Sequence, residues 1–227
     1  LAHNNWERPI YFVTGYHPDA LGLEEYFQLE GLAYRLVPIK SQKESWLDYG
    51  RIETDIMYDN MMNKFVWGGA NDPKVNIDYH HLRTLMVVRA RLNYAKLAKA
   101  LVARGKDEKA LQVLDFCMEK LPLNTVKYDP YVNDIIEAYF AAGNKEKAIE
   151  MTTDLCNHFY AHMDYYLRQK PYIVSSSDYS IGTAFEYTRR AGEACIANGQ
   201  TDMGVEINKK LQEYYSKYMG LVEPAKR

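Results

Sequence analysis

The stretch Arg91–Pro122, RLNYAKLAKALVARGKDEKALQVLDFCMEKLP, decides the fold of this chain. Apolar and small residues recur three or four positions apart on both sides of Gly105, and Pro122 ends the pattern. This spacing predicts two antiparallel helices joined by a tight turn at the glycine. Ala98 and Ala110 stand where the two helix backbones would need to approach closely. A single hairpin cannot bury its apolar faces, so it requires neighbours.

The pattern recurs twice along the chain. Residues 129–160 repeat it around Gly143, where GNKEKAIEMT matches GKDEKALQVL, and residues 185–217 repeat it more weakly around Gly199. In the third copy, glycine replaces the packing alanine. The offsets resemble the tetratricopeptide repeat, a helical hairpin of about 34 residues. We therefore predict a mainly α fold, a tetratricopeptide-like array of about three hairpins over 91–227 (91–122, 129–160, 185–217).

The N-terminal residues carry a different pattern and predict a small βα unit over 1–45. Residues 8–14 (RPIYFVT) and 32–39 (LAYRLVPI) are rich in β-branched and aromatic side chains and predict two strands. Residues 23–30 (LEEYFQLE) between them suit one or two helical turns. On such a helix Glu24, Glu25 and Glu30 would lie on a solvated face. The result is a strand-helix-strand unit, which needs further packing partners to be stable.

Residues 46–90 predict connecting helices and a glycine-rich loop. A helix is expected over 52–65, followed by the loop WGGAND. From Tyr79 to Val102, one long helix or two helices stacked end to end should lead into the first hairpin. Later in the chain, the helix of the second hairpin should continue to about Gln169 and break at Pro171. It should restart near Asp178, whose side chain is a candidate N-cap.

Composition limits the classes of function. The chain has 227 residues, 47% of them hydrophobic and 26% charged, with a formal net charge of −2. This charge gives no electrostatic reason to expect nucleic acid as a partner. No apolar run approaches the ~20 residues of a membrane span. Cys117, Cys156 and Cys195 occupy apolar helical positions, which predicts buried thiols and no disulfide framework.

A search for catalytic and metal-binding patterns yields no specific constellation. His158 and His162 are four residues apart, which is a spacing used by metal ligands, but Phe159 stands where the zincin pattern requires glutamate. Arg89 and Arg91, with Arg83, could grip an anion, although a solubilising basic flank fits them better. We therefore assign no catalytic residue, no metal site and no cofactor.

The N-terminal segment also resembles a known family. The sequences HNNWERPIYF (His3–Phe12) and LGLEEYFQLEGLAYRLVPI (Leu21–Ile39) are similar to the region that follows the last membrane span in a Bacteroidetes-type family of multi-pass membrane proteins of poorly defined function. The membrane half of that family is similar to protein O-mannosyltransferases, and its soluble C-terminal region carries tetratricopeptide-like repeats. The catalytic carboxylates would lie in the membrane half, so none is assigned here.

This resemblance implies a non-catalytic, periplasm-facing interaction domain of an integral-membrane glycosyltransferase-like protein. Its partners would be its own membrane domain and a partner protein or peptide. Contacts to the membrane half are expected at Arg8, Tyr11, Tyr34 and Arg35, because partly covered strands would expose them. The first helices of tetratricopeptide hairpins line a concave groove, and that resemblance places in it Lys99, Asn133, Glu137, Phe140, Arg189 and Glu193.

Two other functions fit the same sequence. One is a free-standing helical-repeat adaptor that binds a peptide or partner protein in an open groove. The other is an enzyme whose site lies between the βα unit and the helices, in a closed pocket with shifted pKa values. With only about three repeats, the concave groove of the array could instead be filled by the N-terminal βα unit, and the groove residues would then belong to the core. The residues encoded upstream of Leu1 would discriminate best, because long apolar segments there favour a membrane-anchored parent.

Overall fold

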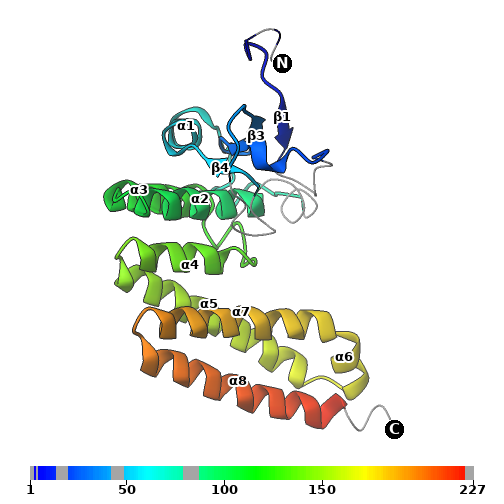
Figure 1. Cartoon of the computed structure of the whole chain (residues 1–227). Helices are drawn as coiled ribbons and strands as arrows, with labels where there is room; N and C mark the ends of the chain where they lie inside the picture. The colour runs from blue at the N-terminus through cyan, green and yellow to red at the C-terminus, as the bar shows by residue number, and fades with distance from the viewer. Residues whose placement is uncertain (1–2, 4, 14–19, 42–48, 79–86, 223–227) are drawn as a thin grey trace. The chain divides into compact units, whose positions relative to one another are not determined.

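The computed structural model describes residues 3, 5–13, 20–41, 49–78 and 87–222. The chain divides into two compact units, unit 1 at Leu1–Ala142 and unit 2 at Gly143–Arg227. A small sheet near the N-terminus precedes a series of helices, which confirms the predicted mainly α class (Figure 1). The division falls at the turn of the second predicted hairpin, so the two helices of that hairpin belong to different units.

A four-stranded sheet forms the N-terminal part of unit 1. Its strand order is β1-β3-β2-β4, with β1 and β2 antiparallel to β3, and β4 parallel to β2. The sheet places β1 at one edge and β4 at the other. The strands are short: β1 Tyr11–Val13, β2 Phe27–Leu29, β3 Ala33–Leu36 and β4 Arg51–Ile52.

The helix predicted over residues 23–30 is largely wrong. Only Glu24–Tyr26 is helical, as the 3₁₀ turn η2, and β2 follows at once. All three residues of β2 are buried, and β3 and β4 flank it on either side. The local apolar pattern suits either a helix or a strand, and the hydrogen bonds offered by two neighbouring strands decide the outcome.

The connecting region of unit 1 follows the prediction more closely. The helix expected over 52–65 is present as α1 Thr54–Asp59 and the π-helical turn η3 Asn60–Lys64. The helix expected from Tyr79 is seen as α2 Val87–Val102, and residues 79–86 lie outside the described part of the chain. Figure 1 shows α2 between the sheet with α1 on one side and α4 on the other.

The first predicted hairpin is present in unit 1. Helix α2 packs against α3 Asp107–Lys120, and Gly105 forms the turn with a φ of 69°. This left-handed conformation favours glycine. Ala98 and Ala110 are fully buried, as the close approach of two helices requires. Helix α4 Val132–Ala141 then packs mainly on α2 and also touches α3.

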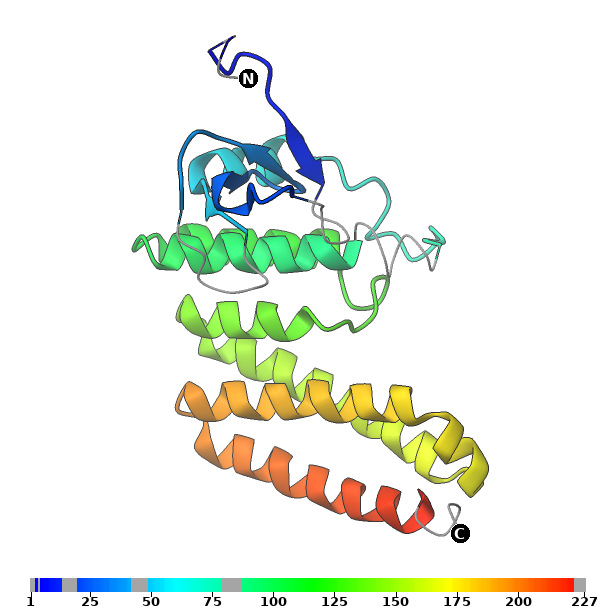
Figure 2. The ribbon, with the colours of Figure 1, turned by 45° about the vertical axis from the view of Figure 1, so that its right-hand side comes forward.

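Unit 2 contains a long helix, a short helix and a terminal hairpin. Helix α5 Lys145–Leu167 packs on α7 Asp178–Ala197 and touches α8 Thr201–Val222. Helices α7 and α8 run antiparallel (Figure 2). Pro171 is the first residue of the short helix α6 Pro171–Ser176, where its missing N–H costs nothing.

Asp178 does not cap α7 as predicted. It is the first residue of the helix, Ser177 holds the N-cap position, and the Asp178 carboxylate accepts a hydrogen bond of 2.6 Å from the Tyr218 hydroxyl. The Asp178 carboxylate therefore bonds to a side chain of α8, whereas the local sequence predicted that it would bond to backbone N–H groups at the start of α7.

Two glycines let α7 and α8 approach more closely than alanines would. A Cβ on Gly204 would lie 2.7 Å from the Gly192 carbonyl oxygen, and a Cβ on Gly192 would lie 3.1 Å from Ile207. The turn between the helices is at Gly199, with a φ of 79°. The glycines that weaken the repeat pattern in the third copy thus tighten the packing of its hairpin.

Candidate interaction surfaces

The polar network around Arg91 belongs to the core of unit 1. The guanidinium donates hydrogen bonds to the Asp129 carboxylate, to Leu121 O at 2.7 Å, to Lys127 O at 3.0 Å and to Val126 O. Both charged side chains are buried. Arg91 therefore fastens the connection between α3 and α4, and the anion-gripping alternative fails for this residue.

The cysteine and histidine side chains offer little for chemistry. Cys117, Cys156 and Cys195 are free and buried, as predicted. Burial raises the pKa of Cys117 and of Cys156 to about 12, so neither thiolate forms near neutral pH. Burial lowers the pKa of His162, whose ring packs against Phe159 and Tyr166. Among the described residues, no group of three or more His, Cys, Asp and Glu side chains could hold a metal ion.

Strand register builds a polar row across one face of the sheet. Tyr11 pairs with Arg35, Arg35 with Gln28, and Gln28 with Arg51, so one residue from each strand lies in line. Successive side chains on a strand point to opposite faces. The neighbours of these four residues therefore point the other way, and there the ring of Phe27 contacts the rings of Phe12 and Tyr34. We call Tyr11, Arg35, Gln28 and Arg51 the outer sheet row.

Glu30 follows β2 and its side chain contacts three members of this row, so it is not the solvated helix residue that its sequence context suggested. Its carboxylate accepts hydrogen bonds from Gln28 Nε2 at 2.7 Å and from the Tyr11 hydroxyl at 3.1 Å, and Arg35 Nη1 lies 3.8 Å away. Glu30 is itself buried, and these three polar groups replace the water that its carboxylate loses. Partial burial raises the pKa of Tyr11, and the Glu30 charge raises it further.

The four residues predicted to dock on a membrane domain differ in accessibility. Arg8 is exposed, Tyr11 is 49% exposed, and the Arg35 side chain is 34% exposed. Tyr34 is buried against Phe27, so the expectation that partly covered strands expose all four residues is wrong for it. Tyr11 and Arg35 lie side by side in the outer sheet row, with exposed Val13 on the same strand.

The residues assigned to a concave groove in unit 1 do not share one exposed surface. Asn133 and Phe140 are buried, so neither can line an open groove. Lys99 and Glu137 remain partly exposed and pair with each other, with Nζ and Oε2 separated by 2.7 Å. This pair ties α2 to α4. Single-helix periodicity does not specify which positions of α4 tertiary packing buries.

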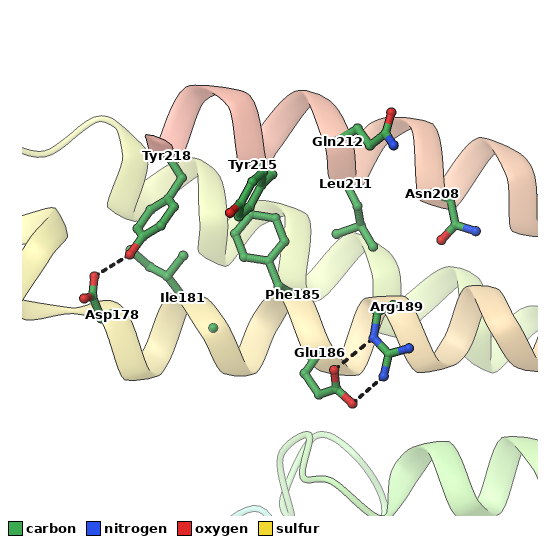
Figure 3. Close-up of a pocket in the computed structure, with 11 residues that line it drawn as sticks. Asp178, Ile181, Phe185, Glu186, Arg189, Asn208, Leu211, Gln212, Tyr215 and Tyr218 are labelled. Atoms are coloured by element: carbon green, nitrogen blue, oxygen red, sulfur yellow. Dashed lines mark hydrogen bonds and ion pairs between the residues drawn. The ribbon is translucent and has the colours of Figure 1, made fainter. Parts of the chain in front are cut away.

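Unit 2 contains a groove between α7 and α8 with a volume of about 510 Å³. Phe185 from α7 meets Tyr215 and Tyr218 from α8 at one end, and the Glu186–Arg189 ion pair lies at the other (Figure 3). Arg189, a predicted groove residue, lines this groove and also pairs with the predicted residue Glu193. The lining residues are Asp178, Ile181, Gly182, Phe185, Glu186, Arg189, Asn208, Leu211, Gln212, Tyr215 and Tyr218.

Comparison with known proteins gives one result, and it concerns the sheet. Residues 1–56 match the family model of TMEM260-associated domain 2. The matched segment contains all four strands and ends within the first turn of α1. It is thus the part of the chain that bears the outer sheet row. No curated protein and no solved structure matches the chain.

Sequence reasoning missed parts of both surfaces. Gln28 and Arg51 join the outer sheet row only through strand register, and the segment of Gln28 was predicted to be helical. Tyr215 and Tyr218 lie on α8, whereas the repeat comparison pointed only to the first helix of each hairpin. The sequence signal that could have pointed to them is the high tyrosine content of the chain, 20 residues, together with the spacing of Tyr215 and Tyr218 on one side of a helix. Exposed apolar clusters of this kind often mark binding surfaces.

Proposed function

We propose that this chain is a non-catalytic interaction region of a membrane-anchored, glycosyltransferase-like parent protein, and that its sheet docks on the membrane-embedded part. The observation that supports this most is the coincidence of the TMEM260-associated domain 2 match with the four-stranded sheet. The same residues carry the resemblance to the segment that follows a last membrane span. Among the described residues, no helix is long and apolar enough to cross a bilayer.

The exposed part of the outer sheet row, Tyr11 and Arg35, has the properties of a docking surface, whereas Gln28 is buried. Tyr11 supplies an exposed aromatic ring at the edge of the sheet, Arg35 supplies a partly exposed guanidinium, and the buried Glu30 carboxylate holds both in place. Tyrosine and arginine are enriched at the centres of protein interfaces. A surface preorganised in this way loses little side-chain freedom when it binds.

The polar groups between the sheet and the helices of unit 1 support a non-catalytic role. Asn93 on α2 donates to Gly31 O at 2.8 Å, Tyr94 donates to Met61 O at 3.1 Å, and Asn60 donates to Glu30 O at 2.7 Å. Each of these side chains satisfies a backbone carbonyl, which is a structural task. Turnover of a polyprenyl-phosphate sugar by the isolated chain would contradict this part of the proposal.

A site-specific crosslink tests the docking surface. The photoreactive residue p-benzoylphenylalanine replaces Tyr11 in the full-length parent, and Tyr172 on α6, which is also exposed, serves as the matched control. We expect position 11 to crosslink to a peptide of the membrane-embedded part and position 172 not to. Equal crosslinking at both positions, or a start codon close upstream of Leu1, would contradict the proposal.

The side of the membrane is part of the proposal and has its own test. If the region faces the periplasm, protease added to intact spheroplasts should cleave it without membrane permeabilisation. If the region is cleaved only after the inner membrane is lysed, it faces the cytoplasm. The docking surface would then be tested by the crosslink alone.

A further inference from the structure

The groove between α7 and α8 corresponds to a surface that is covered in the first hairpin. Gly105 and Gly199 hold equivalent turns, so each residue of the first hairpin corresponds to the one 94 positions later. By this rule, four residues of the groove have counterparts in the first hairpin: Phe185 corresponds to Arg91, Arg189 to Ala95, Leu211 to Cys117 and Tyr215 to Leu121.

The two sets of positions differ in burial at three of the four places, because Leu211 is buried like its counterpart Cys117. In the first hairpin all four residues are buried, because α4 and the connection leading into it lie over α2 and α3. In the third hairpin, Tyr215 is 54% exposed and its counterpart Leu121 is 0% exposed. The third hairpin thus presents, within unit 2, the face on which a following helix packs in the first.

We infer that the α7–α8 groove is a docking site for an amphipathic helix of a partner protein. This goes beyond the proposed function, which concerns the sheet of unit 1. Helix α4 shows the apolar pattern such a helix needs, because Val132, Ile135, Ile136 and Tyr139 are buried at i, i+3, i+4 and i+7. A groove of about 510 Å³ accommodates a few such side chains beside the Phe185, Tyr215 and Tyr218 rings.

Charge defines the partner helix further. On the first hairpin, Lys99 pairs with Glu137 of α4, and the Tyr139 hydroxyl of α4 donates to the Asp115 carboxylate at 2.7 Å. The third hairpin has Glu193 at the position of Lys99 and Lys209 at the position of Asp115, so both charges are reversed. The partner helix should therefore carry Lys or Arg opposite Glu193 and an acidic group opposite Lys209.

The same reversal disfavours a second copy of this chain as the occupant. Its α4 would bring Glu137 against Glu193, and like charges in a contact discriminate against the wrong partner.

A pair of helical peptides tests the inference. The probes are fluorescein-labelled, lactam-stapled peptides with the sequence of residues 129–143, one unaltered and one carrying Glu137→Lys. Fluorescence anisotropy with the whole chain should show about fivefold tighter binding of the lysine peptide. The Glu193→Lys variant of the chain should reverse that preference. A surface charge pair accounts for a difference of this size.

Two tyrosine variants locate the binding site. Tyr215→Glu should weaken binding of the lysine peptide at least tenfold, whereas Tyr179→Glu, on α7 outside the groove and 74% exposed, should leave it unchanged. Far-UV circular dichroism checks that both variants remain folded. Equal affinity of the two peptides, or equal effects of the two tyrosine variants, would overturn the inference.

Light scattering tests whether a second copy of this chain occupies the groove. If the wild-type chain forms a dimer that Tyr215→Glu abolishes, the groove is an interface between copies and the partner helix is excluded. A chain that stays monomeric and binds the lysine peptide with the preference above supports it. None of these results depends on the sheet, so the docking proposal for unit 1 stands or fails separately.

Discussion

The buried guanidinium of Arg91 on α2 donates to the buried carboxylate of Asp129, 38 residues further along the chain. This pair fastens the connection between the first hairpin and α4 to the helix that starts the hairpin. Burial raises the pKa of Asp129, while the Arg91 charge and the N–H groups of Tyr131 and Val132 lower it. Burial is the largest of these effects, so the pKa of Asp129 lies above its usual value, and losing the Arg91 cation would raise it further.

Arg91→Leu should destabilise unit 1 by about 3–5 kcal/mol, because it leaves Asp129 buried without its cation. Urea unfolding followed by tryptophan fluorescence measures this, since Trp6 and Trp67 lie in unit 1 and the sequence of residues 143–227 contains no tryptophan. Lys99→Met on the same helix is the control, and loss of its partly exposed ion pair should cost less than about 1 kcal/mol. Similar midpoints for the two variants would contradict a central role for Arg91.

Gly204→Ala should destabilise unit 2 by about 1–3 kcal/mol, because the new methyl group would collide with the Gly192 carbonyl oxygen and the Ile196 side chain. Gly182→Ala is the matched control, since nothing lies within 4 Å of a Cβ at that helical position. It should stabilise α7 by up to about 1 kcal/mol through helix propensity. Thermal unfolding followed by far-UV circular dichroism measures both, and the opposite order would refute the close packing of α7 and α8.

The hydrogen bond between Tyr218 and Asp178 should make unit 2 sensitive to alkaline pH. This bond, together with partial burial, raises the pKa of Tyr218 to about 12, whereas an unfolded tyrosine titrates near 10. A raised pKa means that the contribution to stability is complete below about pH 10 and is lost as the pH rises to about 12. Melting temperatures from pH 9 to 12 should fall less steeply in Tyr218→Phe than in the wild type. Parallel curves would rule out the coupling.

The three thiols should react slowly in the folded chain. Cys117, Cys156 and Cys195 are buried, and burial raises the pKa of each. Ellman's reagent at pH 8 should detect all three in urea and none in the first minutes without urea. A rapid reaction of one thiol under native conditions would show that the packing around it opens easily.

The helical hairpins were predictable because the signals that build them are local. The i, i+3, i+4 spacing names the buried face of a helix, and Gly105, Gly143 and Gly199 adopt positive φ at the turns where the sequence places them. The strands were predictable only in part. The local pattern of residues 23–30 fits a helix, but Phe27–Leu29 form a strand because they pair with β3 and β4. The sequence of residues 23–30 alone does not specify this pairing.

The candidate surfaces were less predictable than the fold. Tyr11 and Arg35 could be named from the strand sequences, but Gln28, Arg51 and Glu30 join them only through register. Asn133 and Phe140 were placed in a groove by analogy with other repeats, but both are buried.

The sequence by itself determined the helices, their turns and the small residues at which they approach one another, because these depend on neighbours within a few positions. Only the tertiary structure decided which faces stay open: the register that aligns Tyr11 with Arg35, and the groove where Phe185 meets Tyr215. The physical reason is that exposure depends on what packs against a surface from distant parts of the chain. Residues equivalent in the repeat, such as Leu121 and Tyr215, therefore end in opposite environments.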